Sequence, residues 1–187
     1  MSLNGEYKKQ HKPVINSNKV KYHQGYYTPK HPEKCLTKEN VYRSGWEYFF
    51  MRYCDDSPNI VRWASEPIKV QYRNPVANME YCVKNGLDPR NPINWKLCNY
   101  YTDFWVEMKS GDSIRKIFIE IKPFKETQPP KPINEGASLK EHRAFNRAAE
   151  TYLINKEKWK SAAATFAARG AEFMVVTEKT LKKLGMN

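Results

Sequence analysis

Two apolar segments around a Gly-Asp turn constrain this chain more than any other feature of its sequence. Tyr100–Met108 and Ile114–Lys122 have the β-branched and aromatic composition of strands, and Ser110-Gly111-Asp112-Ser113 lies between them. Glycine supplies the positive φ that the first central position of a type II′ turn requires, so we expect a hairpin with a two-residue turn. That register places Asp103 directly opposite Glu120.

This pairing brings two carboxylates together. Opposed Cβ atoms lie about 4.5–5.5 Å apart, and two carboxylates this close raise a pKa unless a cation lies between them. The period of two places Lys122 on the same strand face as Glu120, whereas Ile119 and Ile121 face the other way. Such oxygen ligands suit Mg²⁺ or Mn²⁺. The alternative is an ordinary solvated strand face, because Glu-x-Lys alone is a common pattern.

The rest of the chain alternates helices and strands, which predicts an α/β fold with helices layered on a sheet. Ser44 is a good N-cap for a helix whose apolar stripe begins at Trp46 and which ends near Asp55–Pro58. Strands are expected at 60–63, 68–72 and 173–177, and a short basic helix at the end. A long helix is expected over 139–169, with Gly170 as its stop signal and Phe145, Ala149, Tyr152, Trp159, Ala163 and Phe166 on its buried side.

Charge is unevenly distributed along the sequence. The chain has 32 Lys and Arg against 20 Asp and Glu, a net charge of +12. Residues 1–40 hold 8 Lys against 3 Glu, residues 41–120 hold 11 basic against 10 acidic residues, and residues 121–160 hold 9 against 5. The excess therefore flanks a nearly neutral segment that contains the acids. This pattern favours a polyanionic partner, with nucleic acid first and an anionic membrane surface second, and the alternative is charge that serves only solubility. The mean hydropathy of −0.81 and the absence of a long apolar run exclude a membrane span.

Two segments fall outside the regular pattern. Residues 1–40 are expected to form a basic N-terminal arm before a domain at 41–187. The arm either contacts DNA through phosphates and stacked bases or lies over its own domain or a protein partner; the residues concerned are Lys21, Tyr22, His23, Tyr26, Tyr27 and Lys30. Residues 73–99 are rich in turn signals and are expected to form an insertion. The four cysteines form no C-x-x-C pair, so neither a zinc knuckle nor a disulfide framework is predicted.

Asp103 and Glu120-Ile121-Lys122, preceded by a helix that carries Glu47, resemble the PD-(D/E)xK nuclease superfamily. An ordered set of motifs over roughly residues 40–177 more closely resembles the head-completion nucleases of T-even-type tailed phages. These motifs are Arg43-Ser44-x-Trp46-Glu47, Tyr53-Cys54-Asp55, Trp63-x-Ser65-Glu66, Asp103-Phe104, Glu120-Ile121-Lys122-Pro123 and Asn155-x-x-Lys158-Trp159. The proline that usually precedes the aspartate is Thr102 here. The resemblance implies a restriction-endonuclease-like mixed sheet flanked by helices.

The resemblance also implies roles for single residues. Asp103 and Glu120 would be metal ligands, the Ile121 carbonyl a backbone ligand and Lys122 the catalytic lysine. Glu47 would complete the acidic cluster. From spacing alone, however, Ser44-x-x-Glu47 is a capping box, in which the glutamate bonds back to the helix start. Several cations that follow the catalytic strand would track the DNA backbone without sequence specificity, or else form a solvated helix face; they are Lys125, Arg143, Arg147, Lys156 and Lys158.

The expected function is Mg²⁺- or Mn²⁺-dependent hydrolysis of DNA phosphodiester bonds, and the resemblance implies products with a 5′-phosphate and a 3′-hydroxyl. The resemblance implies that such a protein acts in the host cytoplasm late in virion assembly, when heads are completed and joined to tails. Portal, neck or tail-completion proteins would be its partners, with the head–tail junction as a further location. The rival hypothesis is a non-enzymatic head–tail joining or DNA-binding protein that keeps the nuclease fold.

Overall fold

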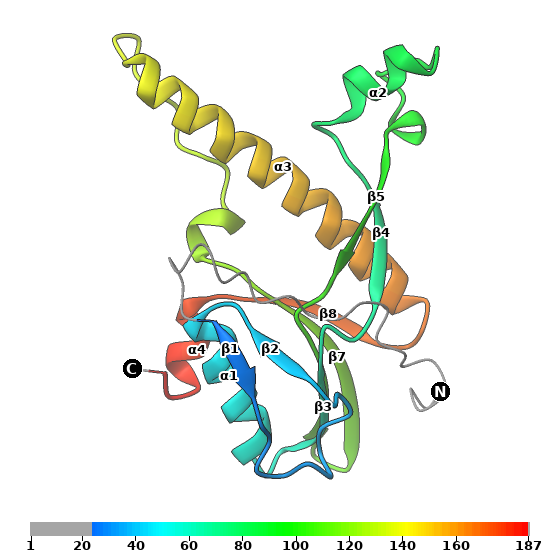
Figure 1. Cartoon of the computed structure of the whole chain (residues 1–187), viewed down its shortest axis with the longest axis vertical. Coiled ribbons are helices and arrows are strands. Elements are labelled where there is room, and N and C mark those ends of the chain that lie inside the picture. The colour runs from blue at the N-terminus through cyan, green and yellow to red at the C-terminus, as the bar shows by residue number, and fades with distance from the viewer. Residues whose placement is uncertain (1–23, 187) are drawn as a thin grey trace.

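A four-stranded mixed sheet with helices on both faces forms the centre of the molecule (Figure 1). The computed structural model describes residues 24–186. The sheet has the order β3-β6-β7-β8, formed by β3 (Ile60–Ser65), β6 (Phe104–Ser110), β7 (Ser113–Ile121) and β8 (Glu172–Val176). β7 and β8 are parallel and the other neighbours are antiparallel. The predicted α/β class with a mixed sheet flanked by helices is confirmed.

The β6–β7 hairpin has the register that the sequence predicts. Ser110 pairs with Ser113, and the ladder continues to Phe104 opposite Ile119. Gly111 has a φ of 58°, and the only non-glycine residue with positive φ in the described chain is Glu66, so Asp112 has the negative φ of a type II′ turn. Because the register contains no bulge, alternate residues of β7 face opposite sides of the sheet along its whole length.

The two faces of the sheet carry separate apolar cores. On one face, Ile117, Ile119 and Ile121 pack with side chains of α1 (Gly45–Asp56) and α4 (Glu178–Lys183). On the other face, Phe118 stacks on Phe166 of α3 (Leu139–Ala167), with ring centroids 3.6 Å apart. Glu120 has the same parity as Phe118 and therefore lies on the α3 face.

The sequence predicts the bounds of α1 well and the packing of α3 less well. Ser44 caps α1 and accepts from the Glu47 amide, as expected. α3 begins with a capping box between Ser138 and Glu141 and ends just before Gly170, whose φ is 68°. Its buried residues are Asn155, Ala162 and Phe166, whereas the predicted Ala163 is exposed and Phe145, Ala149 and Tyr152 are half-buried. The prediction was wrong for Ala163, and the other three are only partly covered because the N-terminal part of α3 projects beyond the sheet (Figure 1).

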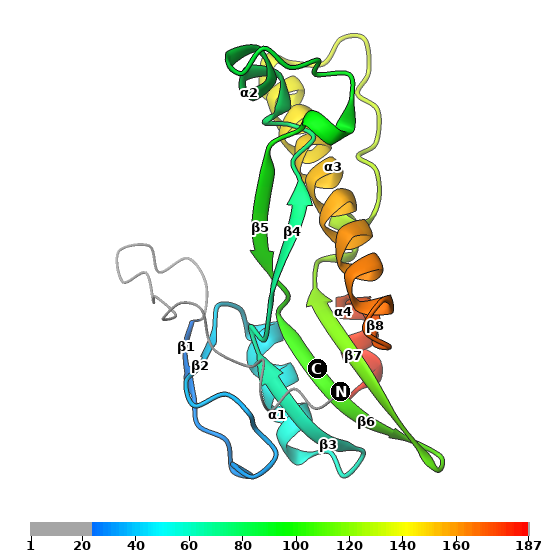
Figure 2. The same cartoon turned by 90° about the vertical axis from the view of Figure 1, so that its right-hand side faces the viewer.

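The predicted strand Tyr100–Met108 is two strands in two sheets. β5 (Leu97–Tyr101) pairs with β4 (Lys69–Arg73), and β6 begins only after Thr102 and Asp103. Of the predicted insertion 73–99, residues 74–96 lie between the paired strand ends, with α2 (Asn78–Lys84) and the 3₁₀ turn η2 (Pro92–Asn94) at the tip. Figure 2 shows this hairpin leaving the sheet beside α3. The break places Asp103 where the two sheets meet.

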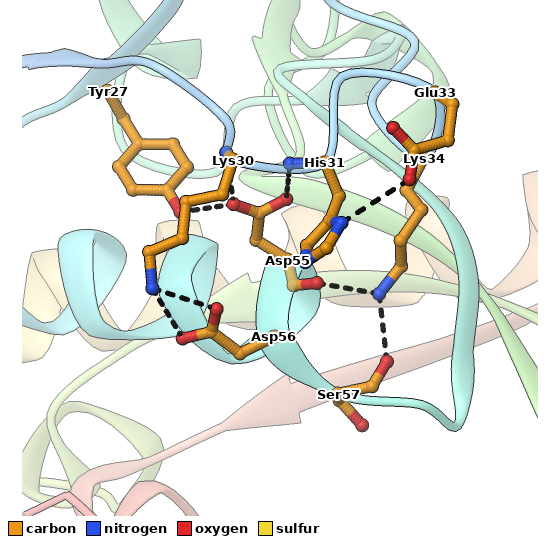
Figure 3. Close-up of polar contacts among 8 residues, drawn as sticks. All are labelled: Tyr27, Lys30, His31, Glu33, Lys34, Asp55, Asp56 and Ser57. Carbon is orange, nitrogen blue, oxygen red and sulfur yellow. Dashed lines mark hydrogen bonds and ion pairs between the residues drawn. The ribbon is translucent and has the colours of Figure 1, made fainter.

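Residues 24–44 pack on their own domain. β1 (Gly25–Tyr27) pairs with β2 (Asn40–Tyr42), and the segment between them wraps around the end of α1 (Figure 3). The buried Asp55 carboxylate accepts from the Tyr27 hydroxyl at 2.7 Å and from the backbone amides of Lys30 and His31 at 2.7 and 3.1 Å. Of the two roles left open for the arm, this part covers the domain. Lys21, Tyr22 and His23 lie outside the described residues.

The rest of the chain follows the predicted order. β8 and α4 occupy the expected final strand and short basic helix, and η3 (Phe124–Thr127) is a 3₁₀ turn in the proline-rich loop before α3. The four cysteines, all within the described residues, form no disulfide. Within residues 24–186, the helices are too short or too polar to cross a bilayer.

Candidate active site

Asp103 and Glu120 meet where the central sheet adjoins the β4–β5 hairpin. Asp103 lies one residue before β6, and Glu120 is the penultimate residue of β7. The Ile121 amide donates to the Asp103 carboxylate at 2.7 Å, and the Asp103 carbonyl accepts from the Glu66 amide at 2.8 Å. Both ends of Asp103 are therefore fixed by backbone groups. The predicted juxtaposition of the two acids is present.

Glu120 and Lys122 form an ion pair on the α3 face of the sheet. Lys122 Nζ lies 3.1 Å from Glu120 Oε1. The Glu120 side chain is 3% exposed, and its second oxygen, Oε2, is buried without a hydrogen-bond partner. An unpaired buried carboxylate oxygen is costly. The Lys122 ammonium thus satisfies only half of the Glu120 carboxylate, and the other half can accept a cation or a proton.

The electrostatics of the three residues follow from burial and from one another. Burial, followed by the charge of Glu120, raises the pKa of Asp103 well above its usual value, and Lys122 opposes this effect only in part. Burial also raises the pKa of Glu120, although Lys122 stabilises its charge. Burial would lower the pKa of Lys122, but the two carboxylates outweigh it and raise that pKa. Burial and mutual repulsion of the two carboxylates therefore outweigh the help of Lys122, which favours a bound proton or cation at the site.

Glu47 lies at the start of α1 and has an electrostatic link to the acids, but it does not close the predicted capping box, because its carboxylate bonds to the Arg43 amide rather than to the amide of the N-cap Ser44. Its carboxylate accepts from the Arg43 amide at 2.8 Å and from the Ser44 hydroxyl at 3.0 Å. Its charge also contributes to the raised pKa of both Asp103 and Glu120. A pocket lined by Glu47, Lys122 and Lys125 joins the start of α1 to the end of β7. A structural role at the start of α1 and proximity to the site therefore coexist at this residue.

Lys158 of α3 lies at the site with two tyrosines of the hairpin. Its Nζ is 5.6 Å from the Tyr72 ring centroid and 5.4 Å from that of Tyr100. The Tyr100 hydroxyl donates to the Lys158 carbonyl at 2.9 Å. Burial lowers the pKa of Lys158, against the attraction of Glu120. Burial and the charges of Glu120 and Asp103 raise the pKa of Tyr100, which places that ring next to the acids.

With this geometry established, comparisons with known proteins identify the family. Residues 57–178 match the TnsA-like endonuclease N-terminal family. The chain is also 35% identical over 164 residues to the head completion nuclease of Enterobacteria phage T4, an alignment that covers 86% of this chain and 95% of that protein. The chain belongs to the TnsA-like endonuclease family. The resemblance to head-completion nucleases is thereby confirmed.

The TnsA-like match covers most of the candidate site. Asp103, Glu120, Lys122 and Lys158 lie within residues 57–178, whereas Glu47 and the segment around Asp55 precede them. The two sheets that meet at Asp103 also lie inside the matched region. The part of the chain that matches the family thus contains the two acids and both lysines that the structure brings together.

The other predicted DNA-binding residues lie apart from the acids. Lys125 is in η3 and lines the pocket that contains Lys122. Arg143, Arg147 and Lys156 are exposed on α3. DNA contact by these side chains stays a prediction. Lys158 differs from them because it is half-buried against aromatic rings rather than solvated.

Sequence reasoning missed Tyr72 and Tyr100. Tyr72 and Tyr100 pack edge to face, with centroids 5.8 Å apart. The sequence predicts that Tyr72 ends one strand and that Tyr100 begins another, but it gives neither side chain a role in the site. The signal that could have found them is the pairing of 69–73 with 97–101, because it places two tyrosines on one face of a hairpin next to Asp103.

Two buried carboxylates are the donors that the site offers to a divalent cation. Among residues 24–186, no group of three or more His, Cys, Asp or Glu side chains is arranged to hold a metal ion. Mg²⁺ commonly uses one or two carboxylates and completes its shell with water and substrate oxygens. Two buried carboxylates with raised pKa values and the orphaned Oε2 of Glu120 fit that pattern. Asp103 and Glu120 are the side chains that could hold such an ion, with the Ile121 carbonyl beside them.

Proposed function

We propose that this chain is a metal-dependent DNA nuclease that hydrolyses phosphodiester bonds at Asp103, Glu120 and Lys122 and acts in phage head completion. The family match and the likeness to a head completion nuclease support the nuclease role. The observation that carries the site assignment is the unpartnered Oε2 of Glu120, which lies buried beside a second carboxylate and a lysine.

In this proposal, the two carboxylates bind the cation and Lys122 acts on the water or the phosphate. Asp103 and Glu120 would hold Mg²⁺ or Mn²⁺ together with the Ile121 carbonyl, and the hydrogen bond from Ile121 keeps the aspartate in place. When bound, the cation supplies Lewis-acid chemistry that lowers the pKa of water and neutralises phosphate charge. The Lys122 ammonium, fixed by Glu120 at 3.1 Å, orients the attacking water or donates to a phosphate oxygen.

A setting in virion assembly follows from the T4 relative. That relative is named a head completion nuclease, and we extend this role to the present chain. It would act on DNA at the packaged head in the host cytoplasm and contact portal, neck or tail-completion proteins at the head–tail junction. The basic charge of the chain fits an association with DNA.

Incubation of the purified chain with linear, nicked and flapped DNA tests the enzyme role. We expect cleavage with Mg²⁺ or Mn²⁺, none with EDTA, and none for Asp103→Asn or Glu120→Gln. Asp112→Asn is the matched control, because Asp112 is an exposed acid at the other end of the same hairpin. Cleaved products that carry a 5′-phosphate would be ligatable, which a ligase assay detects.

The rival function, a non-enzymatic head–tail joining or DNA-binding protein on a nuclease fold, predicts a different result. In that case wild type and Asp103→Asn would be equally inert on all three DNAs while binding DNA equally well. Such an outcome would contradict the enzyme role and leave the fold and the family intact.

A further inference from the structure

A second pocket lies next to η3, between the proline-rich loop and α3. Its volume is about 600 Å³, within the range of roughly 300–1,000 Å³ that small-molecule sites occupy. Phe124 of η3, two prolines of the loop and Tyr152 of α3 provide apolar lining. Pockets that combine an apolar floor with a few charged groups are typical binding sites.

Three cations border this pocket and lack partners. Lys125, Lys131 and Arg147 line it, together with one acid, Glu126. In the described part of the chain, none of the three cations forms an ion pair, a side-chain hydrogen bond or a cation–π contact. Cations that the protein leaves unpaired around one cavity are available to an anionic ligand. The net positive border favours a phosphate-bearing occupant.

The two aromatic residues that line the pocket differ in their contacts: the Tyr152 ring is available to a ligand, and Phe124 is fixed by its neighbours. The Tyr152 ring makes no ring contact, and its hydroxyl makes no hydrogen bond, with any residue in 24–186. Phe124 is held in place by α4. Its amide donates to Glu178 at 2.8 Å, and Lys179 Nζ lies 3.1 Å from its ring centroid. A free tyrosine face next to a fixed phenylalanine can accept the flat face of a base, and such stacking contributes to binding of single strands.

The pocket adjoins the proposed catalytic groups. Lys125 and Glu126 line both this pocket and the one that contains Glu47 and Lys122. The Glu126 charge also contributes to the raised pKa of Lys122, so the two side chains are close. A DNA strand held at Lys122 therefore reaches the pocket by passing over η3.

We propose that the pocket between η3 and α3 binds an unpaired nucleotide of the DNA substrate, next to the cleaved bond. A base in a duplex hides its faces in the stack, so a duplex would use the three cations but not the apolar floor. An unpaired nucleotide uses both, because its phosphate meets the cations and its base meets Tyr152. The inference rests on the proposed nuclease function and adds to it a preference for DNA with a single-stranded segment or end.

Binding in EDTA tests the proposal without cleavage. The probes are a fluorescein-labelled blunt DNA hairpin and the same hairpin with a short thymidine overhang, on either the 5′ or the 3′ end, measured by anisotropy. We expect Tyr152→Ala to weaken binding of an overhang probe about five-fold or more, and of the blunt probe less than about two-fold. Tyr152→Phe should bind as wild type does. Arg147→Ala should weaken overhang binding more than Arg143→Ala, which changes an exposed arginine one turn away that does not line the pocket.

Equal weakening of both probes by Tyr152→Ala, or no weakening of either, would overturn the proposal. Circular dichroism of each variant shows whether α3 is intact, and Tyr152→Phe and Arg147→Ala remain informative if Tyr152→Ala does not fold. An overhang preference that depends on Tyr152 in a chain that cuts no DNA would sustain the pocket and refute the nuclease. DNA cleavage by a chain with no overhang preference would support the nuclease function and refute the proposed role of the pocket.

Discussion

The Ile121 amide donates a hydrogen bond to the Asp103 carboxylate at 2.7 Å. This bond from backbone to side chain lies just beyond the last paired residues of β6 and β7, Phe104 and Ile119. It holds the aspartate against the end of β7, where Glu120 is buried and Lys122 is its ion-pair partner. The fold therefore keeps two repelling carboxylates together at the cost of stability, an arrangement typical of functional sites.

Asp103→Asn should stabilise the protein in EDTA while it abolishes cleavage. Asparagine still accepts from the Ile121 amide but carries no charge next to Glu120. Because the pKa of Asp103 is raised in the folded chain, its contribution to stability is full below the unfolded value of about 3.9 and is lost as pH rises through the folded pKa. The variant should thus be more stable by about 0.5–2 kcal/mol at neutral pH, as other active-site replacements are. Urea unfolding across a pH series measures this.

The same variant should lose its advantage at low pH, where Asp103 of the wild type is protonated. Asp112→Asn, in the exposed turn, should show no such pH-dependent difference. A replacement at Asp103 that destabilised the protein at every pH would indicate that its charge supports the fold, contrary to the raised pKa.

Mn²⁺ or Mg²⁺ should raise the Tm of the wild type, because an ion that binds only the folded state stabilises it by mass action. At a concentration of about one hundred times Kd the gain is roughly 2.7 kcal/mol. Glu120→Gln should remove most of this shift, since it removes the charge at the orphaned Oε2. Differential scanning fluorimetry with a metal titration gives the result. An equal shift in wild type and Glu120→Gln would place the ion elsewhere.

Lys158 and Lys156 form a matched pair on α3 with different expected effects. Lys158→Ala should lower kcat/KM by about 10-fold or more, because it removes a cation near Glu120 that is held between two tyrosines. Lys156→Ala removes an exposed cation and should lower DNA affinity slightly, with a salt slope smaller by about 1. Kinetics at two salt concentrations separate the two. Equal effects of the two substitutions on kcat/KM and on the salt dependence would indicate that Lys158 only contacts the DNA phosphate backbone.

How far the sequence predicts this structure depends on whether a pattern is local. The Gly111-Asp112 turn fixes the register because a two-residue turn admits only one pairing, so Asp103 and Glu120 were correctly brought together. Ser44 fixes the start of α1 by the same kind of local chemistry.

Long-range pairing limited the prediction elsewhere. Residues 100–108 have one uninterrupted strand composition, and only the partners show that Tyr100 belongs with Val70 and Phe104 with Ile119. The place of Lys158 likewise depends on where α3 docks, which the stacking of Phe166 on Phe118 decides. Apolar periodicity could not show that the first turns of α3 extend beyond the sheet and bury little.

Asp55→Asn should destabilise the protein by about 1–3 kcal/mol, because the two buried carboxylate oxygens accept from three donors and the substitution replaces one of them with an amide that cannot accept. Burial opposes the charge of Asp55, but these hydrogen bonds outweigh it and lower its pKa. The stability that the charge contributes is therefore present above about pH 3.9 and is lost as pH falls through the lowered pKa. Asp56→Asn is the control, since its ion pair with Lys30 is exposed and worth about 0–1 kcal/mol. Similar losses at the two positions would contradict a specific role for Asp55.

Two substitutions separate the structural role of Glu47 at the start of α1 from the role of its charge in the reaction. Ser44→Ala removes the N-cap hydroxyl that accepts from the Glu47 amide and should cost about 1 kcal/mol, but it leaves the carboxylate bonded to the Arg43 amide. Glu47→Gln keeps an acceptor for Arg43 and removes the charge that acts on Asp103 and Glu120. If Glu47 serves the reaction, Glu47→Gln should lower kcat about 100-fold with little loss of stability, whereas Ser44→Ala should lower stability and leave kcat nearly unchanged. A Glu47→Gln variant that cleaves DNA as fast as wild type would show that its structural role at the start of α1 is its whole function.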